Sequence, residues 1–283
     1  MLNRLLSTGA AGQLGSMLRE KLRGRAATLR LSDVADLGEA REGEELVPCD
    51  LSDGDAVMRL VEGCDGIVHL GGISVEKSFD LIEAANLRGV HNLYEAARAH
   101  GQPRIVFASS SHTIGYHPQT ARLDHGAPYR PDGYFGASKI FGEAVASLYH
   151  DKFGQESALV RIGSCTPTPE NWRMLATWFS HDDFVALIEA VFRAPVLGCT
   201  MVWGASNNDH GWWDNSHAAF LGWQPRDNAA DWAEEIARTV PRPDPVEPVA
   251  RYQGGVFTDE PIHRSGNGGP TCLTRPSRRM ANT

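Results

Sequence analysis

Residues 134–139, Tyr-Phe-Gly-Ala-Ser-Lys, bring a tyrosine and a lysine close together in the sequence. A tyrosine has an ordinary pKa near ~10, so it accepts a proton near neutral pH only beside a group such as a lysine ammonium. On a helix, positions 135 and 139 lie about 40° apart around the axis, and positions 134 and 139 about 140° apart. Phe135, which has no proton to exchange, therefore shares the face of Lys139, and Tyr134 does not. The segment predicts a proton-transfer site without its acceptor.

A glycine-rich turn lies near the start of the chain. Residues 8–15, Thr-Gly-Ala-Ala-Gly-Gln-Leu-Gly, follow the predicted strand Arg4–Ser7 and lead into the predicted helix Leu14–Leu22. Small residues let the backbone approach a pyrophosphate, whose charge is stabilised at a helix N-terminus. This context favours a dinucleotide site over a tight turn without ligand. The expected cofactor contacts in the turn are Gly9, Gln13, Leu14 and Gly15.

Acidic residues further along the chain indicate which dinucleotide binds. Asp33 closes the second predicted strand, about 20 residues after the turn, where a carboxylate bonds the ribose hydroxyls and repels a 2′-phosphate. NAD is therefore favoured over NADP, with a simple turn residue as the alternative role of Asp33. Asp50 and Leu51 are expected at the adenine, although Asp50 could equally cap the helix that starts near Asp53.

Strand and helix patterns alternate through the first 165 residues. Besides the strand and helix already named, the predicted strands are Thr28–Ser32, Gly66–Leu70, Arg104–Ala108 and Ala158–Ile162, and the predicted helices are Asp55–Glu62, Leu81–His100 and Phe135–Phe153. Such alternation predicts an α/β fold with a doubly wound parallel sheet, the Rossmann fold, and a small C-terminal substrate lobe.

The chain divides into three predicted parts. Residues 1–165 form the NAD-binding domain, and residues 166–263 form a small, loop-rich substrate-binding lobe interleaved with the sheet. Within the lobe, helices are predicted at His181–Arg193, Trp212–Phe220 and Ala229–Thr239. Residues 264–283 are rich in Gly, Pro, Ser and Arg and are expected to be a disordered tail.

Composition excludes several classes of partner. The net charge of −8 and the lack of a basic stripe outside the tail argue against nucleic acid. No apolar run approaches the ~20 residues that cross a bilayer, so no membrane partner is expected. The five cysteines show neither a CxxC pair nor metal spacing, which predicts reduced thiols, no metal site and a cytoplasmic protein.

Longer stretches of the sequence carry a family resemblance. They are Gly71–Lys77, Ser110–Tyr116, Val160–Thr166, Arg173–Leu175, Thr177–Asp183 and Trp212–His217, together with the glycine turn, Asp33 and Ser138-Lys139. With these stretches the chain resembles the extended short-chain dehydrogenases of the NAD-dependent epimerase/dehydratase superfamily, and among them the bacterial uronate dehydrogenases. The resemblance covers roughly residues 1–263 and leaves out the tail.

The resemblance implies an activity and a set of site residues. Uronate dehydrogenases oxidise C1 of cyclic glucuronate or galacturonate with NAD and give an aldarolactone. By resemblance, Ser110 holds the substrate near the nicotinamide, Lys139 bonds the nicotinamide ribose, and Phe135 stands where the family carries its catalytic Tyr. Further sugar-site positions are Ser74, Ser111, His112, Ser164 and Arg173, and Leu70 joins the cofactor contacts. A homo-oligomer is also implied.

Two of the sugar-site positions involve particular chemistry. An arginine such as Arg173 recognises the carboxylate of a uronate through two parallel, charge-assisted hydrogen bonds. Ser111 departs from the family pattern, in which an Asn stands there; a hydroxyl still donates and accepts, but it reaches less far. His112 is either a hydrogen-bonded wall residue or a catalyst, and Phe257 either covers the sugar or packs in the core.

Phe135 leaves alternative interpretations open. There are three explanations. Phe135 is an introduced substitution, it is a natural loss of the catalytic Tyr, or Tyr134 takes over the role of that Tyr through a shifted helix start. The rival functions are a nucleotide-sugar epimerase or dehydratase and a protein that binds NAD or uronate without turnover.

Overall fold

A parallel sheet forms the centre of the computed structural model, which describes residues 2–263. Within that range the sheet has seven strands in the order β3-β2-β1-β4-β5-β6-β7. The strands are β1 Leu2–Thr8, β2 Ala26–Ser32, β3 Glu44–Leu46, β4 Gly66–His69, β5 Arg104–Ser110, β6 Ser157–Ile162 and β7 Cys199–Gly204. The strand order reverses between β1 and β4, and open α/β sheets bind ligands at such a switch point.

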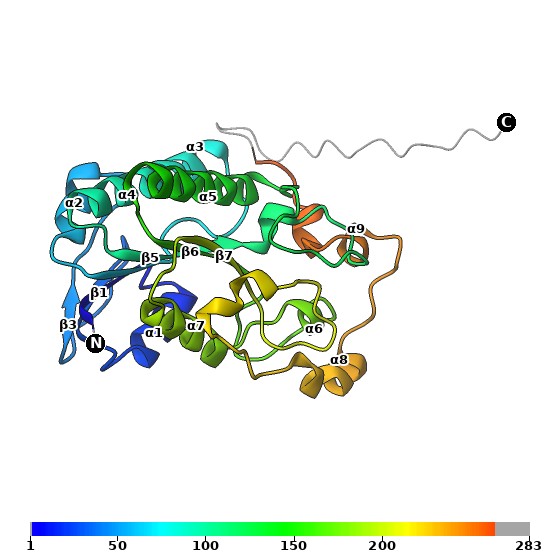
Figure 1. Ribbon diagram of the computed structural model, residues 1–283. Helices are drawn as coiled ribbons and strands as arrows, with labels where there is room; N and C mark the ends of the chain where they lie inside the picture. Colours follow the sequence, from blue (N-terminus) through cyan, green and yellow to red (C-terminus); the bar gives the residue numbers. More distant parts are fainter. Residues whose placement is uncertain (1, 264–283) are drawn as a thin grey trace.

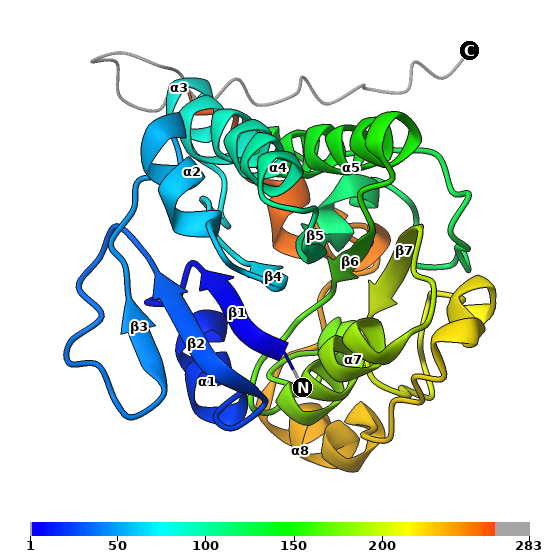
Figure 2. The same cartoon turned by 60° about the vertical axis from the view of Figure 1, so that its left-hand side comes forward.

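Helices cover both faces of the sheet, as a doubly wound fold requires. The long helices are α1 Gln13–Lys21, α2 Gly54–Val61, α4 Gly89–Ala99, α5 Tyr134–Phe153 and α7 His181–Arg193. Helices α2, α4 and α5 lie on one face, and α1 and α7 lie on the other (Figures 1 and 2). The predicted fold class is therefore confirmed. Within residues 2–263, no helix is long and apolar enough to span a bilayer.

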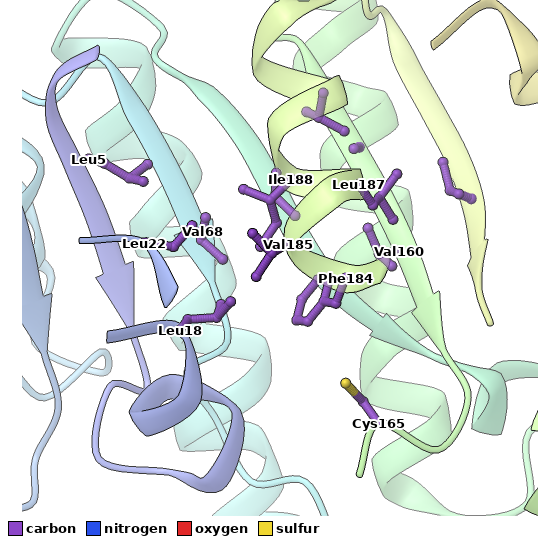
Figure 3. Packing of buried hydrophobic residues seen from close by; sticks show 14 of the residues in the cluster. Leu5, Leu18, Leu22, Val68, Val160, Cys165, Phe184, Val185, Leu187 and Ile188 are labelled. Atoms are coloured by element: carbon purple, nitrogen blue, oxygen red, sulfur yellow. The ribbon is translucent and has the colours of Figure 1, made fainter. Parts of the chain in front are cut away.

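Each sheet face has its own apolar cluster. On the α1 and α7 face, Leu18, Val185 and Ile188 pack toward Val68 of β4 and Val160 of β6 (Figure 3). On the other face, residues of α2 and α4 pack with Ile67, Ile105 and Phe107 of the central strands. Burying one such side chain stabilises the fold by roughly 1.5–3 kcal/mol. These two layers hold the carboxyl ends of the strands in place.

The second half of the chain is built from short elements and one more strand. They are α6 Met174–Thr177, α8 Ala233–Thr239, α9 Pro248–Arg251 and the 3-10 turns η2 Ser111–Ile114, η3 Ser216–Leu221, η4 Ala229–Trp232 and η5 Gly255–Thr258. Leu175, Trp178, Ala229 and Ile236 form a small apolar cluster of their own. Because β7 joins the main sheet, this part shares the sheet of the first 165 residues, and the domain division stays a prediction.

Several sequence predictions differ from the structure. The short strands β3 and β7 were not predicted. The helix predicted at Trp212–Phe220 is wrong over its first half, because only a 3-10 turn from Ser216 forms there. Trp213 instead pairs with Leu123 as an isolated bridge and stacks on the buried Trp203 ring at a centroid distance of 5.0 Å. The predicted disordered tail, residues 264–283, lies outside the described residues.

Candidate active site

A cavity of about 660 Å³ opens at the carboxyl ends of the strands. It extends from the end of β2, past β1 and β4, to the ends of β5 and β6, and therefore spans the switch point of the sheet. Its wall contains most of the predicted site residues. These are Gly9, Gln13, Leu14, Gly15, Asp33, Asp50, Leu51, Leu70, Ser74, Ser110, His112, Phe135 and Lys139. Ser111, Ser164 and Arg173 are not part of this wall.

The glycine turn lies at one end of the cavity, which we call the cofactor end. Its backbone is too tightly packed for a side chain at Gly9 or Gly15. Gly9 has φ +69°, and a Cβ there would lie 2.8 Å from the backbone nitrogen of Gly71. A Cβ at Gly15 would lie 2.1 Å from the carbonyl oxygen of Gly9. Helix α1 follows with no side-chain cap and no acidic residue in its first turn. Its free backbone N–H groups and positive dipole end fit a pyrophosphate.

Asp33 is fixed at the rim beside this turn. Its carboxylate accepts hydrogen bonds from the backbone N–H groups of Ala11 and Ala35, both at 3.0 Å. Capping of α2 is done by Asp53, which accepts from Ala56 N at 3.0 Å. Asp50 accepts from Ser52 N at 2.8 Å and lines the cavity instead. The cavity thus presents a carboxylate where the ribose of a bound NAD would lie, and the residues present fit NAD.

The start of α5 is held by a residue from a distant loop. Glu76 is buried, and its carboxylate accepts from Tyr134 N at 2.9 Å and Phe135 N at 3.0 Å. A carboxylate at a helix N-terminus satisfies free N–H groups and stabilises the dipole. A Cβ at Gly133 would lie 2.2 Å from Glu76 Oε2, so this approach requires glycine. Helix α5 therefore begins at Tyr134 without a shift.

This start places the two aromatic residues in different surroundings. Phe135 is buried and lines the cavity, and Lys139 Nζ lies 5.7 Å from its ring centroid. Tyr134 is not in the cavity wall, and its ring packs edge-on against Phe79 at a centroid distance of 5.6 Å. The structure therefore gives no support to Tyr134 as the proton acceptor.

Lys139 is a buried cation in this wall. Burial lowers its pKa to about 8, and its Nζ also lies 5.2 Å from the ring centroid of Phe107. His69, below it in β4, is buried as well, and burial together with the charge of Lys139 lowers the pKa of His69 to about 3. A lysine near its pKa at neutral pH can lose or regain a proton at low cost.

His112 and Asp132 form a close pair beside Phe135. His112 Nδ1 lies 2.7 Å from Asp132 Oδ2, and the Asp132 side chain is fully buried. The imidazole centroid is 5.7 Å from the Phe135 ring and 3.9 Å from the Phe257 ring. Phe257 therefore packs on the histidine at this end of the cavity. The Ser110 hydroxyl accepts from His112 N at 3.1 Å and faces the same space.

Arg173 lies behind this end of the cavity. It donates to the carbonyl oxygen of Gln253 at 2.6 Å, to Ser164 Oγ at 3.0 Å and to Ser111 Oγ at 3.4 Å. Burial lowers the pKa of Arg173 to about 10, and the charge of Asp132 opposes this shift. The structure thus brings Ser111, Ser164 and Arg173 together as one cluster. The hydrogen bonds of Arg173 go to the two serine hydroxyls of this cluster and to the backbone carbonyl of Gln253.

Three supporting residues were not identified from the sequence. Glu76 lies within the quoted stretch Gly71–Lys77 and Asp132 lies outside all the quoted stretches, and the partners of both are far away along the chain. Asn86 accepts from Ile73 N at 2.7 Å and donates to Ser138 Oγ at 2.8 Å, and Ser138 donates to the Phe135 carbonyl at 2.7 Å. Asn86 thereby ties the Ser74 loop to α5. Asn86 lies in the π-helix η1 Glu83–Arg88, and the periodicity of the sequence does not reveal such a π-helix.

The chain is similar to proteins of one family. Residues 5–166 match the family model described as the NAD dependent epimerase/dehydratase family. Uronate dehydrogenase of Agrobacterium fabrum strain C58 is 65% identical over 263 residues, which cover 93% of this chain and 99% of that protein.

Two solved structures agree with that similarity. A uronate dehydrogenase mutant from Agrobacterium tumefaciens, complexed with NAD, has a TM-score of 0.92 at 65% identity and covers 93% of this chain and 99% of its own. The glucuronic acid dehydrogenase of Chromohalobacter salexigens has a TM-score of 0.91 at 55% identity and covers 93% and 98%.

Proposed function

The chain belongs to the uronate dehydrogenases of the NAD-dependent epimerase/dehydratase family, and we propose that it oxidises C1 of cyclic hexuronates to aldarolactones with NAD. This function rests on one observation. The glycine turn and Asp33 at one end, and Ser110, His112 and Lys139 at the other, line a single cavity at the switch point of the sheet. A dinucleotide bound along that cavity would bring its nicotinamide to the end formed by Ser110, His112 and Lys139, which we call the sugar end.

The residues of this chain take distinct roles. We assign the pyrophosphate to the turn at Gly9 and Gly15, the adenosine ribose to Asp33, and the adenine to Asp50 and Leu51. Lys139 holds the nicotinamide ribose, and Ser110 holds the substrate hydroxyl at C1. Gln13, Leu14 and Leu70 complete the cofactor contacts. Bound NAD supplies the acceptor for the hydride that leaves C1.

We assign the sugar carboxylate and ring hydroxyls to the far end of the cavity. Arg173, with Ser111 and Ser164, forms the cationic cluster behind that end, and Ser74 and His112 line the cavity itself. An arginine held by hydroxyl groups can exchange them for the two oxygens of a carboxylate at little cost in ordering. Glucuronate and galacturonate both carry this group.

Phe135 supports a second candidate, a protein that binds NAD and uronate with little turnover. The Phe135 ring lines the cavity wall. By the family resemblance this is the position of the catalytic tyrosine, so the hydroxyl of that tyrosine is missing. A positioned acid or base group contributes roughly 10²–10⁴-fold to kcat. We therefore expect strong binding of both ligands and a kcat well below that of a Phe135→Tyr variant.

The direct test is to mix the protein with NAD and glucuronate or galacturonate and to follow the absorbance of the reduced cofactor. Reduction of NAD by uronates supports the proposed function. Binding of both ligands without reduction supports the second candidate, and turnover of a nucleotide sugar in place of a uronate would overturn both.

Two further proposals concern the whole protein. The four described cysteines, Cys49, Cys64, Cys165 and Cys199, are free thiols, which supports a cytoplasmic location. We also propose a homo-oligomer, as the family resemblance implies; sedimentation at several protein concentrations tests it.

A further inference from the structure

The imidazole of His112 has one nitrogen engaged and one nitrogen open. Nδ1 lies 2.7 Å from the Asp132 carboxylate, whereas no described residue forms a hydrogen bond with Nε2. The side chain lines the cavity and keeps 12% of its surface exposed. The rings of Phe135 and Phe257 both pack against the imidazole, at centroid distances of 5.7 and 3.9 Å.

Asp132 lies in a slot that the chain keeps open with glycines. A Cβ at Gly115 would lie 1.9 Å from Asp132 Oδ2, and a Cβ at Gly254 would lie 2.0 Å from the same oxygen. These glycines come from distant segments that are joined by a hydrogen bond from Gly254 N to Gly115 O. Asp132 Oδ1 is buried without a hydrogen-bond partner among the described residues. A carboxylate held at this cost has a use beyond packing.

The carboxylate determines which tautomer the histidine takes. A carboxylate oxygen only accepts hydrogen bonds, so Nδ1 of a neutral imidazole carries the proton and Nε2 keeps its lone pair. The same arrangement of a buried carboxylate and an imidazole prepares histidine as a general base in hydrolases. In this chain the prepared nitrogen lies in the wall that Phe135 and Lys139 also form.

We propose that His112 Nε2 is the proton acceptor for the C1 hydroxyl of the substrate in this chain, with Asp132 as its positioning residue. The proposal rests on the uronate oxidation proposed above. The hydroxyl proton passes to Nε2, and the hydride from C1 passes to NAD as C1 becomes the carbonyl carbon of the lactone. The imidazolium then releases its proton to water, so that each turnover gives lactone, reduced NAD and one proton.

Lys139 is the competing acceptor in the same wall. Its ammonium is buried and lies over the rings of Phe107 and Phe135, and among residues 2–263 it has no oriented partner comparable with Asp132. A cation beside the nicotinamide ribose is better placed to lower the charge on the developing alkoxide than to take its proton. The experiments below separate the two residues.

The tautomer can be measured without turnover. Long-range proton–nitrogen NMR spectra of the histidine rings in the ligand-free protein should show His112 protonated at Nδ1. Asp132→Asn, whose amide donates toward the ring, should move the proton to Nε2, and Asp124→Asn, an exposed control, should leave it in place. A His112 ring protonated at Nε2 in the unaltered protein would overturn the proposal.

A double-mutant cycle then tests catalysis. His112→Gln should lower kcat for glucuronate by at least ~10²-fold in the Phe135 protein, with the dissociation constant of NAD unchanged. In a Phe135→Tyr background the phenol takes the proton, so the fold loss of kcat caused by His112→Gln should be about tenfold smaller there. His91→Gln, on the exposed face of α4, is the matched control and should have no effect in either background.

The outcomes distinguish this proposal from the proposed function. If Phe135→Tyr oxidises uronates but the unaltered chain binds both ligands without turnover, the second candidate function holds and the role of His112 is wrong. An equal loss of kcat from His112→Gln in both backgrounds makes His112 a binding residue and overturns the proposal. Loss in Lys139→Met with no loss in His112→Gln assigns the proton to lysine. No turnover by any variant overturns both proposals.

Discussion

The two ends of the cavity differ in the groups that form them: backbone groups at one end and side chains at the other. The cofactor end uses backbone: glycines that exclude a Cβ, a helix start without a side-chain cap, and Asp33 held by two backbone N–H groups. The sugar end uses buried polar side chains that hold one another, namely the His112–Asp132 pair and the Arg173 cluster. A backbone site is fixed by the fold, whereas a side-chain site can lose one group and keep its shape. Phe135 lies at the sugar end, which is built from side chains.

The largest effect should come from restoring a hydroxyl at the sugar end. Phe135→Tyr should raise kcat for uronates by roughly 10²–10⁴-fold and leave the dissociation constant of NAD unchanged, because only the proton transfer gains a group. Steady-state kinetics together with calorimetric titration of NAD measure both. Tyr134→Phe is the control and should change neither; a loss of activity in that control would restore Tyr134 as a candidate acceptor.

The next effect concerns Lys139, the buried cation at the sugar end. The folded-state pKa of Lys139 is lowered from 10.5 to about 8, so the unfolded chain binds more protons between these values and stability rises with pH in that window. Relative to Lys139→Met, the unaltered protein should gain up to roughly 3 kcal/mol in free energy of unfolding from pH 8 to pH 10.5. Urea unfolding at both pH values measures the difference. A constant difference would show that Lys139 is not desolvated.

At the cofactor end, Asp33→Ala should weaken NAD binding by roughly 1.5–3 kcal/mol, the usual contribution of hydrogen bonds to a charged group. The kcat at saturating NAD should change little, since we assign the reacting atoms to the other end. Asp36→Ala, an exposed aspartate in the following turn, serves as the matched control. Unchanged NAD affinity in Asp33→Ala would remove the ribose assignment.

The smallest effect should come from the support of α5. Glu76→Ala removes the acceptor for two backbone N–H groups and should lower the free energy of unfolding by roughly 0.5–2 kcal/mol. It should reduce kcat more than NAD affinity, because it loosens the start of α5, where the Phe135 ring packs against His112. Glu83→Ala, which breaks the exposed ion pair with Arg88, is the control and should cost less than about 0.5 kcal/mol.

The sequence predicted the regular parts of the molecule well. Helix α7 was predicted at His181–Arg193, the bounds that it has, because its apolar residues recur every three to four positions behind the capping Ser180. The edge strand β3 has three half-buried residues and no apolar run to detect. The segment that starts at Trp212 fits the helical pattern and was predicted as a helix, whereas the ring of Trp213 is fixed by stacking on Trp203.

The same contrast holds within the site. The cofactor end could be predicted because its signal is local: a turn, a helix start and one carboxylate at a set distance along the chain. The pair of His112 and Asp132 has no such signal, since their contact joins residues twenty positions apart through a loop. Glu76 likewise meets α5 across 58 and 59 positions. Such contacts depend on tertiary packing, which periodicity does not encode.

The slot around Asp132 has a consequence for how the protein is made. One wall is Gly254, and the neighbouring Gln253 carbonyl holds Arg173, whereas the glycine turn and Asp33 directly follow the first two strands. Chains leave the ribosome from the N-terminus and fold as they emerge. The NAD-binding end can therefore assemble early in synthesis, and the sugar end closes only after residues 253–255 have been made. A ribosome-stalled intermediate would bind the cofactor before it could recognise a sugar acid.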